Sequence, residues 1–259
     1  MCKHEMLAST DYYLPRSPVP SPRLMHLSNQ PAYILHTRPW RETSLLLEVF
    51  SREHGRNGLL ARGVRAQRAR ITRAMLEPFQ LLSLDWAGTG ELPNLRAAEV
   101  IGTANRYAGD TLLSGLYVNE LLARLTARHD PHPDLFDRYA LLLDELAMTL
   151  SLPWTLRRFE RDLLAELGYG LLLDRVAETG APISADSEYV YVPEHGPVPA
   201  DLPSGPRVRG TALLALHEDT LPQASDLAAL RRMLRAVIGA QVGENGLRAW
   251  RVLGGAMRG

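Results

Sequence analysis

The chain has 259 residues, of which 29 are basic, 29 are acidic and nearly half are apolar. This length and composition predict a packed protein with two domains, or one large domain with appendages. Cys2 is the single cysteine, which excludes a disulfide within the chain and a zinc site built from several thiolates. No apolar run approaches the roughly 20 residues of a membrane helix, and the first ten residues lack the apolar centre of a secretory signal. We therefore expect a cytoplasmic protein.

The positive charge is concentrated in one part of the sequence. Residues 32–75 contain nine arginines and three glutamates, so this segment carries +6 and the remainder −6. Its most basic stretch, residues 62–73, holds five arginines and no acidic residue. Guanidinium groups stay charged and bind phosphate oxygens in bidentate geometry. Taken alone, the stretch is compatible with a nucleic-acid contact and equally with a solvated helix face.

The first hundred residues predict a leader followed by a small barrel. Residues 1–30 carry four prolines among serines and show no periodicity, which indicates a disordered leader, with Met25 as an alternative start. Apolar runs separated by glycine turns predict five strands, at 33–38, 44–50, 58–64, 78–86 and 94–103. The basic residues 65–75 read as a loop with a short helix. Five strands with the longest insertion after the third favour an oligonucleotide-binding (OB) barrel over residues 31–105.

Helical periodicity follows and predicts an antiparallel three-helix bundle over residues 106–170. Asp110 and Ser151 are expected helix caps, and Gly168 is expected to end the third helix in the left-handed conformation. Residues 171–259 give weaker signals. They are an isolated strand at 188–192, a stretch rich in proline and glycine at 193–210, a helix capped by Ser225 and a short helix at 247–257. The predicted fold class is therefore α+β, in several domains.

Motifs for catalysis are missing from the sequence. It has no phosphate-binding loop, no serine elbow and no dinucleotide fingerprint, so we expect a non-enzymatic protein without cofactor or metal. His129 and His132, with Asp130 between them, have a spacing that a metal could use. A solvated loop between two helices is the favoured interpretation.

Aromatic residues in the predicted barrel could stack on nucleic-acid bases. The candidates are Tyr33, Trp40, Phe50, Phe79 and Trp86. Alternation favours core positions for Tyr33 and Phe50. Trp40, between Pro39 and Arg41, is the best candidate for an exposed ring.

Ordered motifs in the chain resemble the RecO family of DNA repair proteins. They are Arg38, Glu42 and Ser44 at the start of the second strand, the hairpin at 50–55 (FSREHG) and the segment at 61–65 (ARGVR) before the basic loop. Downstream segments at 78–79, 115–121, 135–139 and 156–169 resemble the same family in the same order. The resemblance covers residues 31 to about 175, and the ordered set is more specific than any single motif.

The resemblance implies a recombination mediator without catalytic turnover. Such a protein would bind single- and double-stranded DNA, anneal complementary strands, recognise the acidic tail of single-stranded DNA-binding protein (SSB) and act with RecR to load RecA, in the cytoplasm and associated with the nucleoid. Some members carry four zinc-binding cysteines. Here Val176 and Thr179 stand where the first pair is expected, and residues 196–202 offer no second pair. We therefore expect residues 171–259 to form a degenerate, cysteine-free zinc-module region and helices that pack on the bundle.

Two groups of residues are the expected contacts. For nucleic acid they are Arg38, Trp40, Arg41, Arg56, Arg62, Arg65, Arg68, Arg70 and Arg73. For the SSB tail they are Arg124 and Arg128 on the first helix and Arg157 and Arg158 on the third, because an acidic amphipathic peptide needs cations beside an apolar groove. Solvated helix charges remain the alternative for the second group. Two other functions stay open: an adaptor that binds only proteins, and an enzyme with a site assembled from scattered residues.

Overall fold

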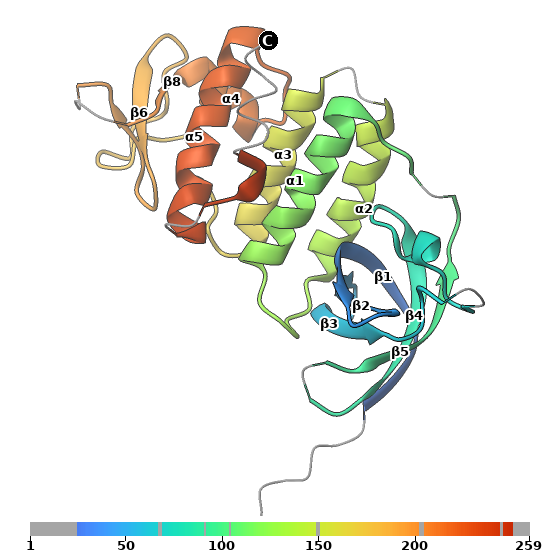
Figure 1. The fold of residues 1–259 in the computed structure, drawn as a ribbon. Helices are drawn as coiled ribbons and strands as arrows, with labels where there is room; N and C mark the ends of the chain where they lie inside the picture. Colours follow the sequence, from blue (N-terminus) through green and yellow to red (C-terminus); the bar gives the residue numbers. More distant parts are fainter. Residues whose placement is uncertain are drawn as a thin grey trace, which may run out of the picture.

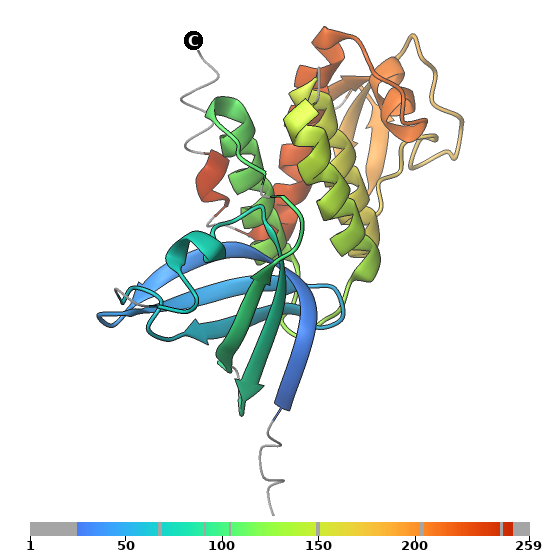
Figure 2. The same ribbon diagram turned by 90° about the vertical axis from the view of Figure 1, so that its right-hand side faces the viewer.

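The computed structural model describes residues 25–66, 69–90, 92–103, 105–148, 151–201, 205–243 and 246–250. The chain forms a barrel, then a helical region, then a small sheet. Figures 1 and 2 show the helical region lying between the barrel and the small sheet. No helix in the described ranges is long and apolar enough to cross a membrane.

Five strands close the barrel in the order β1-β2-β3-β5-β4. They are β1 (Met25–Trp40), β2 (Ser44–Ser51), β3 (Gly55–Ala61), β4 (Leu81–Gly88) and β5 (Asn94–Val100). Neighbouring strands are antiparallel except β3 and β5. This arrangement is OB-like and confirms the five predicted strands.

The long first strand corrects the predicted leader. β1 has 16 residues and pairs with both β2 and β4, with register shifts that let it bend around the barrel. Because β1 begins at Met25, the leader predicted to reach residue 30 was too long. The remainder of the predicted leader, residues 1–24, lies outside the described residues.

Alternation along the strands fills the barrel. Leu45, Leu47 and Val49 of β2 point inward, and Leu46 and Glu48 between them are only half-buried and point outward. The expectation that Trp86 offers a stacking face is wrong, because its ring lies fully buried in this core. Trp40 is 39% exposed, which confirms it as an exposed ring.

Aromatic residues join the barrel to the helices α1 (Gly109–Leu125) and α2 (Pro133–Met148). Tyr33 and Phe50 are buried against α2, with the Tyr33 ring centroid 5.2 Å from Phe136 and 5.0 Å from Tyr139. The core positions predicted for both residues are therefore confirmed. Phe79, another stacking candidate, is also buried and packs edge-on against Tyr107.

A buried polar contact fixes this junction. Asn119 of α1 donates through Nδ2 to the Leu35 carbonyl of β1 (2.9 Å) and accepts a hydrogen bond from the Tyr139 hydroxyl (2.6 Å). Breaking either bond would leave a polar group unsatisfied in the core, which costs roughly 1–3 kcal/mol. The barrel and the helical region are thus held in one relative orientation.

The helices confirm the predicted bundle with one shift at a helix start. α1 begins at Gly109, so Asp110 lies in its first turn and Ala108 occupies the cap position. α3 (Leu152–Glu166) starts after Ser151, as predicted. Gly168 has φ +83°, the left-handed conformation expected of it.

The C-terminal part is more regular than the sequence indicated. β6 (Glu188–Val192) is not isolated, because it pairs with β7 (Gly196–Pro199) and β8 (Arg207–Arg209) in the stretch expected to be irregular. α4 (Gly210–His217) follows β8 directly and was not predicted. α5 (Ala224–Val242) begins one residue before Ser225, so Gln223 and not Ser225 occupies its cap position, and the helix packs against α1 and α3. The predicted helix at 247–257 is described only to Trp250.

In the region expected to be a zinc module, backbone hydrogen bonds join residues 174–176 to residues 181–183. The Val176 amide donates to the Ala181 carbonyl (2.8 Å), the Ile183 amide donates to the Asp174 carbonyl (2.9 Å), and the Val176 side chain lies in the hydrophobic core. That this region is a degenerate zinc module stays a prediction.

Candidate nucleic-acid interface and peptide groove

The outer surface of β1, β2 and β3 forms a continuous face, here called the barrel face. Strand register places Arg38 of β1 beside Leu46 of β2, and Trp40 beside Ser44. Leu46 in turn lies beside Leu60 of β3, and Glu48 lies beside Gly58. Because these residues alternate with the buried ones, their side chains point away from the barrel core.

Two cavities lie along the barrel face. One, of about 650 Å³, is lined by Trp40, Arg41, Glu42, Thr43, Ser44, Leu60, Arg62 and Gly63. The other, of about 290 Å³, is lined by His36, Arg38, Leu46, Leu47, Glu48, Gly58, Leu92 and Arg128. The first involves the β1–β2 loop and the second the β4–β5 loop. OB barrels bind oligonucleotides on this same face and these same loops.

Four of the predicted nucleic-acid residues gather here: Arg38, Trp40, Arg41 and Arg62. Arg65 lies close by, because its amide donates to the Thr43 carbonyl of the β1–β2 loop (3.1 Å). The structure therefore centres the candidate interface on the barrel face, with only the start of the basic stretch at its edge.

The rest of the basic stretch is placed differently. Arg70 is exposed in the β3–β4 connection, and Arg73 opens the short helix η1 (Arg73–Leu76), where it pairs with Glu77 at 3.7 Å. Arg68 lies outside the described residues. Neither cavity of the barrel face includes Arg70 or Arg73.

Arg56 is corrected to a structural role. Its Nη1 donates to Glu48 Oε1 (2.6 Å), and its Nε and Nη2 donate to the Thr126 carbonyl beyond α1 (3.2 and 2.9 Å). Its side chain is only 15% exposed. The guanidinium joins the barrel to the helical region, and these bonds occupy all three of its nitrogens.

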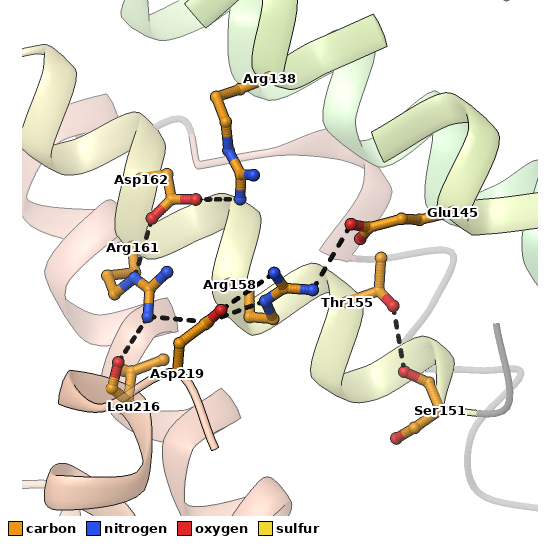
Figure 3. Close-up of polar contacts among 9 residues, drawn as sticks. All are labelled: Arg138, Glu145, Ser151, Thr155, Arg158, Arg161, Asp162, Leu216 and Asp219. Atoms are coloured by element: carbon orange, nitrogen blue, oxygen red, sulfur yellow. Dashed lines mark hydrogen bonds and ion pairs between the residues drawn. The ribbon is translucent and has the colours of Figure 1, made fainter. Parts of the chain in front are cut away.

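The four arginines predicted to bind the SSB tail do not form one site. Arg124 is exposed on α1, whereas Arg128 lies beyond the end of that helix and lines a cavity of the barrel face. Arg158 is held by Asp219 in bidentate geometry (2.8 and 3.0 Å) and also bonds to Glu145 (3.5 Å). Figure 3 shows this network, in which Arg161 also joins Asp219 (3.1 Å).

The charge of Asp219 is stabilised within that network. Burial acts to raise the pKa of Asp219, but the hydrogen bond from Arg158 and the charges of Arg158 and Arg161 outweigh it and hold the pKa below its ordinary value. Arg158 therefore links α3 to the segment after α4, and it does not line the groove described next.

Of the four arginines predicted to bind the SSB tail, only Arg157 lines a groove that could hold a peptide. The groove, here called the α3–α5 groove, has a volume of about 530 Å³ and a mainly apolar lining. It is lined by Tyr117, Pro153, Leu156, Arg157, Glu160, Ala224, Leu227, Ala228, Arg231, Arg232, Arg235 and Trp250. The three α5 arginines were missed, although their spacing beside the apolar stripe of that helix was a readable signal. The Arg235 guanidinium lies 4.8 Å from the Trp250 ring centroid.

The floor of the α3–α5 groove is polar. Glu160 is 1% exposed, pairs with Arg157 and accepts a hydrogen bond from the Tyr117 hydroxyl (2.6 Å). Burial, followed by the Glu160 charge, raises the pKa of Tyr117 well above its ordinary value. Glu160 Oε2 and Arg157 Nε have no hydrogen-bond partner within the described part of the chain, so the floor retains an acceptor and a donor.

The barrel, its cationic face and the attached helices define an OB-barrel protein with a helical partner domain. Residues 25–104 match the family described as recombination protein O N terminal, and residues 106–251 match recombination protein O C terminal. The chain therefore belongs to the RecO family.

Curated relatives agree with this assignment over most of the chain. DNA repair protein RecO of Xanthomonas oryzae pv. oryzae is 44% identical over 234 residues, covering 88% of this chain and 97% of the relative. The protein of the same name from Stenotrophomonas maltophilia is 42% identical with the same coverage. That from Ralstonia nicotianae is 42% identical, covering 86% of this chain and 83% of the relative.

Proposed function

We propose that this protein acts in DNA repair and recombination by binding single- and double-stranded DNA on the barrel face and annealing complementary strands. Family membership supports the role in repair and recombination. The observation that carries the DNA-binding proposal is that Arg41 and Arg62 share one cavity with the exposed Trp40 and that Arg38 lines the second cavity of the same face, the face that OB barrels use for oligonucleotides.

The arginines and Trp40 would have different roles in binding. The guanidinium groups neutralise phosphates and release condensed counterions, which makes the affinity depend on salt. The Trp40 ring stacks on a base, and stacking accepts any base because each has a π face. Phosphate contacts position the strand without reading its sequence. Annealing requires this tolerance, because complementary strands of any sequence must be held.

The α3–α5 groove is the proposed site for the acidic tail of SSB. An apolar lining accepts the hydrophobic side chains of such a peptide, and the cations Arg157, Arg231, Arg232 and Arg235 attract its carboxylates. The barrel face and this groove are separate surfaces, so a strand and the tail can be bound together.

The remaining expectations follow from the family resemblance. We propose that the protein works without catalytic turnover, acts with RecR in loading RecA, and resides in the cytoplasm with the nucleoid.

An annealing assay with matched variants tests both surfaces. Complementary strands, naked or coated with SSB, are mixed with wild type, with Arg41→Ala/Arg62→Ala or with Arg232→Ala/Arg235→Ala. We expect the first variant to be slow on all strands and the second to be slow only on coated strands. Arg207→Ala, which changes one exposed arginine of the small sheet, is the control. A wild type that accelerates neither reaction contradicts the proposal.

A further inference from the structure

Arg128 belongs to the helical half of the chain but lies on the barrel face. It follows the end of α1, and its backbone forms an isolated bridge with Arg56 of β3. The next amide, of His129, donates to the Arg56 carbonyl (3.0 Å). These backbone contacts hold the backbone of Arg128 beside β3.

The side chain is then held across the barrel face. Arg128 Nη2 donates to Glu48 Oε2 (2.7 Å), while the other oxygen of Glu48 binds Arg56. The Arg128 side chain is 41% exposed, against 16% for Glu48. The guanidinium lines the cavity that also contains Arg38 and Leu92 of the β4–β5 loop.

Gly58 makes room for this arrangement. A Cβ added at Gly58 would lie 2.8 Å from Arg128 Nη1, closer than real Cβ contacts allow. Gly58 does not have positive φ, so its backbone does not require glycine. The missing side chain matters because the guanidinium lies in the space above it.

The charges of the three residues leave a cation at the surface. Arg56 and Arg128 together carry two positive charges and Glu48 one negative charge. Arg56 is shielded and bonded to the Thr126 carbonyl as well as to Glu48. The surplus positive charge is therefore presented by Arg128, the exposed member of the group.

We propose that Arg128 is a further phosphate-binding residue, so that the nucleic-acid site is built from both the barrel and the helical region. A strand bound along the barrel face passes from the cavity at Trp40 to the cavity at Arg38 and meets Arg128 at its far end. Glu48 is a positioning residue, which orients the guanidinium. This inference rests on the proposed DNA binding and specifies where the bound strand leaves the barrel.

Single-strand binding by four proteins tests this inference: wild type, Arg128→Ala, Gly58→Ala and the control Arg207→Ala. Arg207 resembles Arg128 because it is 50% exposed and pairs with one glutamate (3.1 Å), but it lies on the small sheet, on the other side of the helices (Figure 1). Affinity for a labelled oligonucleotide is measured by fluorescence anisotropy at several salt concentrations.

We expect Arg128→Ala to weaken binding about fivefold and to reduce the magnitude of the salt slope by about 0.7, the value for one phosphate contact with a single strand. Gly58→Ala keeps the charge but displaces the guanidinium, so affinity falls while the melting temperature stays near that of wild type. Arg207→Ala binds as wild type does.

Two failures are distinguishable. If wild type binds and Arg41→Ala weakens binding while Arg128→Ala leaves affinity and slope unchanged, the composite site is refuted and DNA binding on the barrel stands. If wild type shows no salt-dependent binding, the proposed function itself fails. Arg128→Lys, with its fold checked by circular dichroism, serves as a second variant. A wild-type salt slope with reduced affinity supports a contact that depends on guanidinium geometry, and full wild-type affinity refutes the positioning role of Glu48.

Discussion

Replacing Arg41 and Arg62 by alanine should reduce the salt dependence of DNA binding by about two fifths. The two residues line one cavity of the barrel face, and Arg38 and Arg65 complete the four barrel arginines nearest to it. With Arg128 as the fifth phosphate contact, the slope of log affinity against log salt is about −3.5 for a single strand. A rise in salt from about 50 to 200 mM then weakens wild-type binding about 130-fold.

The double variant retains three of the five contacts. Its expected slope is about −2.1, so the same rise in salt weakens its binding only about 18-fold. Fluorescence anisotropy with a labelled oligonucleotide, repeated at five or so salt concentrations, measures both slopes. Arg207→Ala, which removes one arginine far from the barrel, should retain the wild-type slope. A double variant with an unchanged slope would refute the assignment of phosphates to this cavity.

Four further results are expected. Trp40→Ala should weaken single-strand binding by about 1–3 kcal/mol without changing the salt slope, because stacking releases no counterions; a changed slope in anisotropy titrations would argue against a stacking role. Arg235→Ala should weaken binding of an acidic SSB-tail peptide severalfold in calorimetry, since it removes a cation from the groove, and an unaltered affinity would count against the groove. Gly55→Ala should lower the unfolding free energy by about 3 kcal/mol, because Gly55 has φ +61° and an added Cβ would lie 2.0 Å from the Asp130 carbonyl oxygen. The control Gly63→Ala, with φ +69° but open space around the added Cβ, should lower it by only about 1 kcal/mol. Equal losses for the two variants would show that the contact with Asp130 is unimportant. Asp219→Asn should lower the unfolding free energy by about 1 kcal/mol at neutral pH. Asparagine can adopt the positive φ of 59° found at this position, but it has no charge to pair with Arg158.

The Asp219 effect has a defined pH dependence. The folded pKa of Asp219 lies below its ordinary value, so its contribution is present above the unfolded pKa of about 3.9 and is lost as pH falls through the folded pKa. Urea denaturation of wild type and variant should therefore give a stability difference that is constant near neutrality and shrinks in acid. A difference that grows in acid would contradict the assigned sign.

The barrel strands were predictable because the patterns that identify them lie within short stretches of sequence. Alternating apolar residues and glycine turns identified all five strands, and the exposed Trp40 followed from its place in a turn. The first residues of β1 were missed because most of them are polar and they are stabilised by pairing with β4. β7 and β8 were missed for a similar reason, since they are short strands that depend on pairing with β6.

The roles of individual arginines were less predictable, because their partners lie far away in the sequence. Arg56 bonds to the carbonyl of Thr126, and Arg158 to the carboxylate of Asp219. Neither pairing leaves a local pattern, so both residues read as available cations. The α3–α5 groove likewise exists only after two distant helices pack together.

Photo-crosslinking gives the most direct test of the central claim that DNA lies on the barrel face. A single strand substituted with 5-iodouridine is irradiated in complex with the protein, and the crosslinked peptides are identified by mass spectrometry. We expect the main crosslink at Trp40, with loss of that product in Trp40→Phe/Arg41→Ala/Arg62→Ala. Crosslinks confined to the small sheet of β6, β7 and β8, with none on the barrel, would contradict the account.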